Sequence, residues 1–218
     1  MLEAVIFDMD GVIVDSEPWH LEVNLKLFEE LGFELSLEEY KQFIGKSNID
    51  MWSLLKNKYS LKQSMQELLK IQGEKNIQYL QQQKDGLIEG ILTLLRTLKE
   101  KGIPTGLASS SSLEYIEAVL DKYKIREYFQ VVVTGESMEK GKPAPDIFLY
   151  TAKLLEAKSE NCVVIEDSEN GVKAAKAGGM RCIGFKNPNS GEQDLHGADW
   201  LIDSIKEIRF EDLIRLFR

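Results

Sequence analysis

The chain has 218 residues, of which 43% are hydrophobic and 29% are charged, and its formal net charge at pH 7 is −9. This length suits one large domain or a core domain with a smaller insertion, and the acidic balance argues against a nonspecific nucleic-acid binder. No apolar run approaches the ~20 residues that span a membrane, and the early acidic residue Glu3 does not fit a signal peptide. A cytoplasmic protein without membrane contact is therefore expected.

The first apolar run, at residues 4–7, predicts a short strand that is buried on both faces. Asp8 and Asp10 follow it one residue apart, and Gly11 supplies a turn. Because alternate side chains of a strand share one side, both carboxylates are expected to face the same way. Beside buried apolar surface, each needs a cation, a proton or water. This stretch alone is compatible with an ordinary strand-end turn carrying solvated acids or with a charged site.

Five further runs resemble the first, and helical patterns separate them. The runs lie at residues 103–108, 131–133, 162–165, 181–185 and 200–202, and the helical patterns at 87–102, 113–125, 146–157 and 170–179. Strands that alternate with helices predict an α/β fold with a doubly wound parallel sheet and right-handed crossovers.

Residues 16–84 interrupt this alternation, because helical patterns follow one another there with no strand between them. Within this segment Ser36 and Glu39 have the spacing of a capping box. Two domains are therefore expected: an α/β core of residues 1–15 and 85–218, and a helical domain of residues 16–84, called the insertion below.

Polar residues follow four of the predicted strands near the point where each strand ends. They are Asp8, the serines from Ser109 to Ser111, Lys142, and the pair Glu166-Asp167. Open parallel sheets bind ligands at the carboxyl ends of their strands. These acids, hydroxyls and the lysine are therefore expected to converge on one edge of the sheet.

The four sets belong to the stretches FDMDGV, ASSS, GKPAPD and IEDSENG. In this order they resemble the four signature motifs of the haloacid dehalogenase superfamily, and the insertion resembles the family's four-helix cap. The resemblance covers nearly the whole chain and is greatest to the group that contains β-phosphoglucomutase and small-metabolite phosphatases. Each motif alone is weakly specific, whereas the ordered set is highly specific.

The resemblance implies two catalytic roles in the first motif. Asp8 would be the nucleophile that forms an aspartyl-phosphate. Asp10 would protonate the leaving oxygen and then activate water, as a general acid and base. The family's dehalogenases and phosphonate hydrolases lack an acid at this position, so Asp10 favours phosphate monoesters.

The resemblance also implies Mg²⁺, a hard ion that takes oxygen ligands. Its ligands would be the Asp8 side chain, the Asp10 main-chain carbonyl and Asp167, with Glu166 in or near the coordination shell. Considered without the resemblance, Glu166-Asp167 could equally be an ordinary acidic cap of the helix that follows.

The remaining motifs would bind the phosphoryl group. Ser109 would donate to its oxygens, assisted by N–H groups of Ser110 and its neighbours at a helix start, although a run of serines also serves as a helix N-cap. Lys142 would pair with phosphate and with Asp8. In isolation Lys142 would be a solvated loop lysine, and the following Pro-Ala-Pro-Asp, as the family has it, favours the catalytic role.

The insertion supplies candidate substrate-binding residues. In β-phosphoglucomutase-like sequences an arginine grips the second phosphate where this chain has Asn48, and a neutral amide cannot form that bidentate charged contact. Lys46 is either a partial substitute or a solvated lysine. His20 stands where mutase-like members have a histidine that helps to bind substrate, with an exposed surface histidine as the alternative.

The expected function is Mg²⁺-dependent hydrolysis of a small phosphate monoester, a sugar or polyol phosphate. A β-phosphoglucomutase-like phosphosugar mutase is the first alternative, and a non-catalytic metabolite-binding protein is the second. The expected partner is a small phosphorylated metabolite rather than nucleic acid or membrane, and the acidic chain is compatible with a monomer. Cys162 and Cys182 lack metal-ligand spacing and are expected to be buried, reduced thiols.

Overall fold

The computed structural model describes residues 1–44, 47–84 and 86–217, and its centre is a six-stranded sheet. The strands are β1 (Ala4–Phe7), β2 (Thr105–Ser109), β3 (Val131–Thr134), β4 (Cys162–Glu166), β5 (Arg181–Phe185) and β6 (Trp200–Ile202), in the spatial order β3-β2-β1-β4-β5-β6. All five neighbouring pairs are parallel. The predicted α/β class with a doubly wound parallel sheet is confirmed.

The strand order reverses beside β1, because the chain adds β2 and β3 on one side of it and β4 to β6 on the other. The crevice outside the carboxyl ends of the strands at such a reversal is where open α/β sheets bind ligands. Asp8 follows β1 directly, and Glu166 is the last residue of the neighbouring β4. The fold therefore brings both acids to this crevice.

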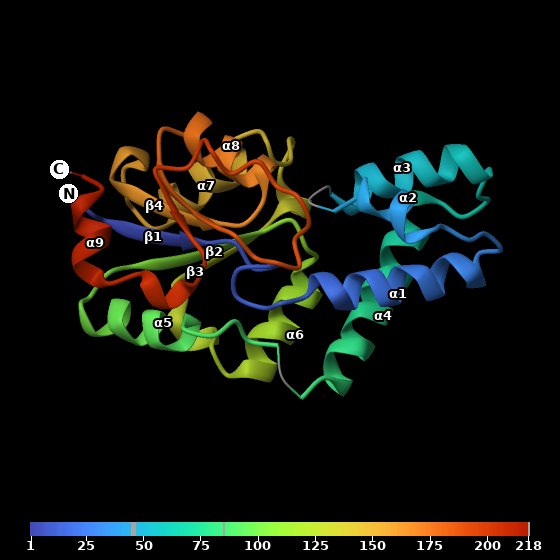
Figure 1. The fold of residues 1–218 in the computed structure, drawn as a ribbon, viewed down its shortest axis with the longest axis horizontal. Coiled ribbons are helices and arrows are strands. Elements are labelled where there is room, and N and C mark those ends of the chain that lie inside the picture. The colour runs from blue at the N-terminus through green and yellow to red at the C-terminus, as the bar shows by residue number, and fades with distance from the viewer. Residues whose placement is uncertain (45–46, 85, 218) are drawn as a thin grey trace.

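Helices cover both faces of the sheet (Figure 1). On one face lie α5 (Ile91–Glu100), α6 (Leu113–Tyr123) and α9 (Phe210–Arg215), and on the other lie α7 (Asp146–Leu154) and α8 (Glu169–Ala177). Val5 and Phe7 of β1 belong to the hydrophobic cluster on the first face, and Ala4 and Ile6 to the cluster on the second. All four are fully buried, as a strand covered on both faces requires.

Helix α5 begins four residues later than the pattern at 87–102 predicts. Gly90, directly before it, has a φ of +98°, in the left-handed region that favours glycine, so the helix cannot extend back through this residue. The apolar residue Leu87 instead forms an antiparallel bridge with Val14. This bridge joins the two chain segments that connect the sheet to the insertion.

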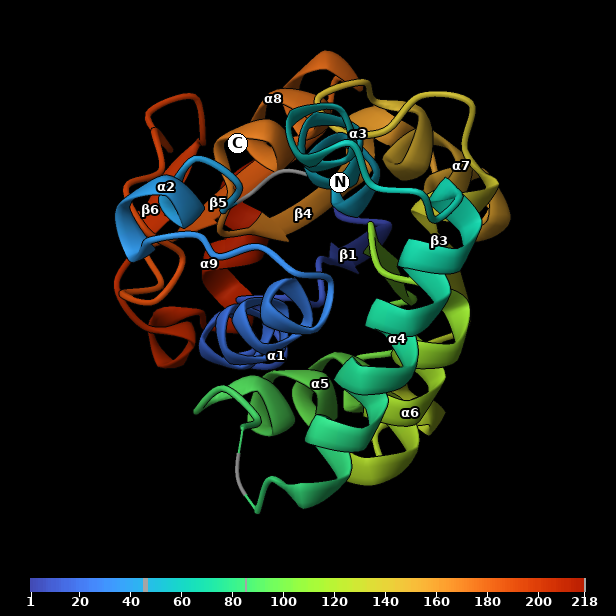
Figure 2. The ribbon, with the colours of Figure 1, turned by 90° about the vertical axis from the view of Figure 1, so that its right-hand side faces the viewer.

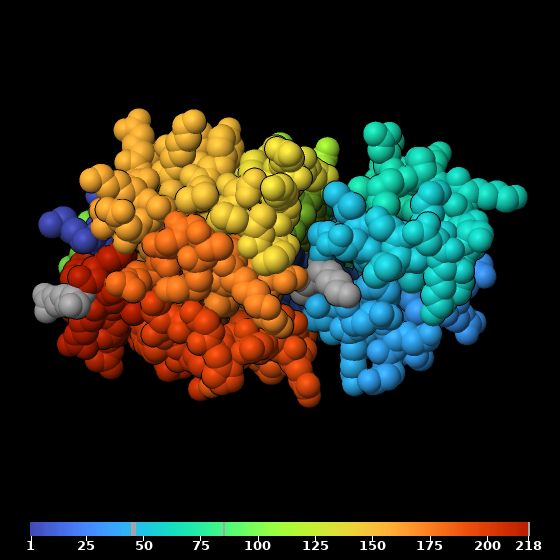
Figure 3. Space-filling model, turned by 90° about the horizontal axis from the view of Figure 1, so that it is seen from above, coloured from blue at the N-terminus to red at the C-terminus, as the bar shows by residue number. Residues whose placement is uncertain are grey.

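The insertion consists of α1 (Glu17–Glu30), α2 (Leu37–Lys41), α3 (Asn48–Tyr59) and α4 (Met65–Gln82). These helices pack around a hydrophobic cluster of their own and lie beyond the carboxyl ends of the strands (Figures 1 and 2). Ser36 and Glu39 form the capping box that their spacing predicts. In the space-filling view the insertion, coloured blue to cyan, meets the rest of the molecule at a narrower waist (Figure 3).

None of the helices in the described ranges combines the length and the apolarity that a membrane crossing requires. Cys162 and Cys182 are both free and buried, which agrees with the reduced thiols that the sequence predicts.

Candidate active site

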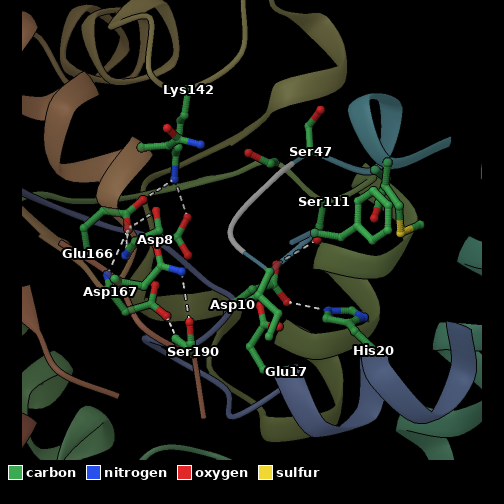
Figure 4. Close-up of a pocket in the computed structure, with 18 of the residues that line it drawn as sticks. Asp8, Asp10, Glu17, His20, Ser47, Ser111, Lys142, Glu166, Asp167 and Ser190 are labelled. Carbon is green, nitrogen blue, oxygen red and sulfur yellow. Dashed lines mark hydrogen bonds and ion pairs between the residues drawn. The ribbon is translucent and has the colours of Figure 1, made fainter. Parts of the chain in front are cut away.

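A cavity of about 120 Å³ lies between the carboxyl ends of the strands and the insertion (Figure 4). Its lining on the sheet side includes Asp8, Asp10, Ser111, Lys142, Glu166 and Asp167. Its lining on the insertion side includes Glu17, His20, Asn24, Tyr40, Asn48 and Met51. Acids and a lysine at the strand ends therefore face side chains of the insertion across one small space.

Asp8 lies directly after β1, where its N–H continues the parallel ladder by donating to the Ile165 carbonyl at 3.0 Å. The residue is 6% exposed, and one carboxylate oxygen lies 2.5 Å from Nζ of Lys142. Burial raises the pKa of Asp8 to about 8; Lys142 opposes the rise, and Glu166 and Asp10 add to it. Asp8 is thus a buried carboxylate whose charge the lysine compensates only in part.

Lys142 lies between two acids. Its Nζ is 2.5 Å from Asp8 and 2.6 Å from Glu166, and 4.8 Å from the ring centroid of Phe148. The side chain is 8% exposed, which is not the environment of a solvated loop lysine. Burial acts to lower the pKa of Lys142, but the two carboxylates outweigh it and raise the pKa. The ammonium is therefore a fixed positive charge in the cavity wall.

Glu166 is held by four hydrogen bonds. One oxygen accepts from Lys142, and the other accepts from the N–H groups of Asp167 at 2.9 Å and Ser168 at 2.8 Å and from the Ser168 hydroxyl at 2.9 Å. The helix α8 passes so closely that a Cβ on Gly171 would lie 1.7 Å from Glu166. The stretch from Glu166 to Gly171 thus folds so that the N–H groups of Asp167 and Ser168 and the Ser168 hydroxyl donate to the Glu166 carboxylate.

Asp167 is 4% exposed and accepts a hydrogen bond from the Ser190 hydroxyl. Gly11, with a φ of +80°, approaches it so closely that a Cβ there would lie 1.9 Å from the Asp167 carboxylate. Asn187 fixes this turn by donating to the Gly11 carbonyl at 2.9 Å. Burial, followed by the charges of Glu166 and Asp8, raises the pKa of Asp167 well above its ordinary value.

Asp10 points toward the insertion (Figure 4). One carboxylate oxygen accepts from the Ser16 hydroxyl at 2.6 Å and lies 3.1 Å from Nε2 of His20, and the other accepts from the hydroxyls of Ser109 at 3.2 Å and Ser111 at 2.7 Å. Burial alone would raise the pKa of Asp10, but His20 and the hydroxyls lower it to about 2. Burial acts to lower the pKa of His20, but Asp10 outweighs it and raises that pKa.

The serines after β2 differ in their surroundings. Ser109 is fully buried beneath the cavity, where its hydroxyl contacts Asp10 and accepts from the Ser111 N–H at 3.0 Å. Ser110 and Ser111 line the cavity, and Ser112 caps α6 by accepting from the Tyr115 N–H. Ser110 and Ser111 therefore lie at the candidate site and Ser112 caps the helix, whereas Ser109, expected to donate to the phosphoryl group, is not among the residues that line the cavity.

Of the candidate residues in the insertion, His20 and Asn48 line the cavity, whereas Lys46 lies outside the described residues. Sequence reasoning missed Ser190, the partner of Asp167, and Glu17, which lines the cavity from the first turn of α1. Ser190 lies in the loop after β5, so the rule that ligands bind at the carboxyl ends of strands could have indicated it.

The residues present fit a magnesium ion. Asp8, Glu166 and Asp167 are three buried carboxylates, and within the described ranges the one cation paired with any of them is Lys142, which contacts Asp8 and Glu166 but not Asp167. No group of three or more His, Cys, Asp or Glu side chains in these ranges is arranged to hold a metal by itself. Mg²⁺ is usually held by one or two carboxylates and keeps several waters, so Asp8 and Asp167 suffice.

Comparison with known proteins agrees with this geometry. The family model of the haloacid dehalogenase-like hydrolases matches residues 5–185. Hexitol phosphatase B of Escherichia coli (strain K12) is 31% identical over 220 residues, which are 97% of this chain and 96% of that protein. The β-phosphoglucomutase of Bacillus subtilis (strain 168) is 31% identical over 216 residues, 96% of this chain and 93% of that protein.

A solved crystal structure of another protein has a fold similar to that of this chain. The crystal structure of CbbY from Rhodobacter sphaeroides in complex with phosphate superposes with a TM-score of 0.85 at 28% sequence identity. The similarity covers 95% of this chain and 96% of that one.

Proposed function

The chain belongs to the haloacid dehalogenase-like hydrolases and is a phosphoric monoester hydrolase, and we propose that it uses Mg²⁺ to hydrolyse a small sugar or polyol phosphate. The observation that carries this proposal is the grouping of Asp8, Lys142 and Asp10 around one cavity. These residues supply a nucleophile, a fixed positive charge and a proton-transfer group, which are the parts that phosphoryl transfer through an enzyme-bound intermediate needs.

In the first step a carboxylate oxygen of Asp8 attacks the phosphorus, so that a bond from Asp8 to phosphorus forms and the bond to the leaving oxygen breaks. Asp10 delivers a proton to that leaving oxygen, which departs as an alcohol. Lys142 offsets part of the negative charge on Asp8 and on the phosphoryl oxygens.

In the second step water attacks the phosphorus of the aspartyl-phosphate. Asp10 accepts the proton of this water, the bond between phosphorus and Asp8 breaks, and inorganic phosphate leaves. The Asp10–His20 pair carries the proton between the steps. The lowered pKa of Asp10 and the raised pKa of His20 favour a shared proton on His20, and its delivery through Asp10 would leave the imidazole neutral.

Bound Mg²⁺ would supply positive charge to the attacking carboxylate and to the phosphoryl group. The side chains of Asp8 and Asp167 and the main-chain carbonyl of Asp10 would hold it. Both oxygens of Glu166 already accept hydrogen bonds, so we assign Glu166 a positioning role beside the ion. Ser110 and Ser111 line the cavity and would bind the phosphoryl oxygens, while Ser109 orients Asp10.

The insertion would act as a cap that excludes bulk water and selects the substrate. Asn48 supports a hydrolase over a mutase, because a neutral amide does not hold a second phosphate as an arginine does. The mutase remains the second candidate, since the Bacillus subtilis relative is one. The free, buried thiols of Cys162 and Cys182 suit the reducing cytoplasm that we propose as the compartment.

The function is tested by phosphate release, with Mg²⁺, from a panel of hexose, hexitol and nucleoside monophosphates that includes β-glucose 1-phosphate. We expect turnover of hexose or hexitol phosphates without any bisphosphate. Conversion of β-glucose 1-phosphate to glucose 6-phosphate that needs a bisphosphate primer, with little free phosphate, would instead establish the mutase.

Replacing Asp10 with asparagine is expected to lower kcat by about 10²–10⁴-fold, because the amide cannot transfer a proton to the leaving oxygen or take one from water. The loss should be smaller for p-nitrophenyl phosphate, whose leaving group needs no proton. Steady-state kinetics with both substrates measures the difference. Because the second step is common to both substrates, the comparison uses kcat/KM, which reports the first step, and equal losses of kcat/KM would contradict proton delivery by Asp10 to the leaving oxygen.

The metal-free protein is expected to lose stability as the pH rises from about 4 to about 8. The pKa of Asp8 rises from 3.8 to about 8 on folding, so the folded state binds more protons than the unfolded state within this window. The raised pKa values of Asp167 and His20 act in the same direction. The lowered pKa of Asp10 matters only as the pH falls from 3.8 toward 2.

Urea unfolding in EDTA and in excess Mg²⁺, at pH 5 and at pH 8, measures this effect. The stabilisation by Mg²⁺ should be greater at pH 8, because the ion binds the ionised carboxylates. If the free energy of unfolding in EDTA is the same at pH 5 and at pH 8, the raised pKa values are contradicted.

A further inference from the structure

A chain of hydrogen bonds between neutral side chains runs through the insertion to the cavity. The Trp52 indole N–H donates to the Gln72 side-chain oxygen at 2.9 Å, and the Gln72 nitrogen donates to the oxygens of Asn24 at 2.8 Å and Asn48 at 3.2 Å. Asn24 then donates to the Tyr40 hydroxyl at 2.8 Å. These five residues, called the amide network below, come from all four helices of the insertion.

The direction of every bond in the amide network follows from Trp52. An indole N–H can only donate, so the Gln72 oxygen must face it and the Gln72 nitrogen must face the two asparagines. Each asparagine therefore turns its oxygen to Gln72 and keeps its nitrogen on the other side. The amide orientations are thus fixed by chemistry rather than chosen freely. Trp52 is fully buried and Gln72 is 1% exposed, so water does not compete for these bonds.

The ends of the amide network at the cavity are consequently donors. Asn48 has its two amide N–H groups left, and Tyr40, which accepts from Asn24, has its own hydroxyl hydrogen left. Within the described part of the chain, no hydrogen-bond acceptor is found for either group. Both residues line the cavity, and Glu17 lines the same side. The insertion thus presents these donors together with the Glu17 carboxylate and with His20, which is paired with Asp10, and its described lining residues include no lysine or arginine.

We propose that Asn48 and Tyr40 determine specificity by donating to uncharged hydroxyl oxygens of the substrate, and that Trp52 and Gln72 are positioning residues that fix the direction of these donors. This inference rests on the proposed phosphatase function and narrows it to monophosphates of polyhydroxylated carbon chains. Glu17 disfavours a second anionic group beside these donors. Among the described lining residues, Asn48 and Tyr40 would offer a second phosphate uncharged donors rather than a cation.

The alternative is that the amide network only supports the helical bundle. A structural role predicts that its loss affects all substrates alike, because it would change stability or the closure of the insertion. A role in specificity predicts a loss confined to substrates that carry hydroxyl groups. Acetyl phosphate has a transferable phosphoryl group and no hydroxyl-bearing chain, so it reports the chemistry without the proposed contacts.

The test compares kcat/KM for sorbitol 6-phosphate and for acetyl phosphate in the Mg²⁺-loaded enzyme. Asn48→Asp keeps the oxygen that Gln72 needs but presents an acceptor in place of two donors. Gln72→Met removes the groups that orient both asparagines. We expect each variant to lower the ratio of the two kcat/KM values by about ten- to a hundred-fold, mainly through KM for sorbitol 6-phosphate.

Gln78→Met, at an exposed position of the same helix α4, is the matched control and should leave both values unchanged. Thermal unfolding shows whether Gln72→Met folds. If it does not fold, Asn48→Asp still tests the proposal, because Asn48 lies at the cavity. A ratio that stays at the wild-type value in both variants would overturn the specificity role and leave the phosphatase standing. Wild-type enzyme that releases phosphate from neither compound would remove the phosphatase, and this inference with it.

Discussion

Replacing Asp8 with asparagine is expected to lower the rate of phosphate release by at least about 10³-fold, whatever the leaving group of the substrate. An amide is a poor nucleophile at phosphorus, so the aspartyl-phosphate no longer forms and neither half of the reaction proceeds. Phosphate release from sorbitol 6-phosphate at saturating Mg²⁺ measures the loss. Retention of a tenth or more of the wild-type rate would show that water attacks the ester directly.

The same substitution is expected not to lower the free energy of unfolding, which separates the catalytic loss from misfolding. Asp8 is 6% exposed beside Glu166 and Asp167, so its charge opposes folding. Asparagine removes that charge, and Lys142 retains Glu166 at 2.6 Å. Urea unfolding in EDTA should give a midpoint equal to or above that of the wild type. A marked decrease would show that the pair of Asp8 with Lys142 is a net stabilising contact.

The sheet could be predicted because its strands are covered on both faces and are therefore almost wholly apolar. The start of α5 could not be predicted, because two facts outside the local pattern decide it. Gly90 adopts a positive φ beside Lys206, from a distant part of the chain, and a Cβ there would lie 3.0 Å from the Lys206 main-chain nitrogen. Leu87 is apolar because it pairs with Val14 rather than because it faces a helix interior.

The sequence could predict that the residues of the candidate site lie together after the strands, but it could not predict their orientations. The four consecutive serines cannot be told apart in sequence. Their surroundings differ because β2 ends at Ser109. The Ser109 hydroxyl therefore contacts Asp10, while Ser110 and Ser111 line the cavity. The amide network could not be predicted from the sequence either. Trp52 and Gln72 are twenty positions apart on different helices, and no spacing rule connects them.

The charged residues of the candidate site are placed so that buried carboxylates surround a small number of positive charges. Three carboxylates converge at the ends of β1 and β4, and this arrangement costs stability until positive charge joins it. Lys142 supplies part of that charge permanently, and a metal ion would supply the rest when the substrate phosphate is also present. An arrangement that is unfavourable in the metal-free protein is thereby suited to bind a cation and a phosphoryl group together.

Lys142→Met is expected to destabilise the metal-free protein by about 3–5 kcal/mol, because it leaves Asp8 and Glu166 buried without their cation. Activity should fall as well, since the attacking carboxylate and the phosphoryl oxygens lose a fixed positive charge. Urea unfolding and phosphate release measure the two effects. Lys186→Met, at an exposed position, is the control and should change stability by no more than about 0.5 kcal/mol.

The double variant Lys142→Met/Glu166→Gln tests whether the unpaired charge of Glu166 causes the destabilisation of Lys142→Met. Glutamine keeps an oxygen for the N–H groups of Asp167 and Ser168 but removes one of the unpaired charges. If charge dominates, the double variant should regain much of the stability that Lys142→Met loses while remaining inactive. If it is as unstable as the single variant, the destabilisation does not come from the unpaired Glu166, and the lost contact of the Lys142 ammonium with the Phe148 ring is the remaining source. Stability recovered without activity would show that the fold needs the charge of Lys142 mainly to offset Glu166, whereas catalysis needs it beside Asp8 and the phosphoryl group.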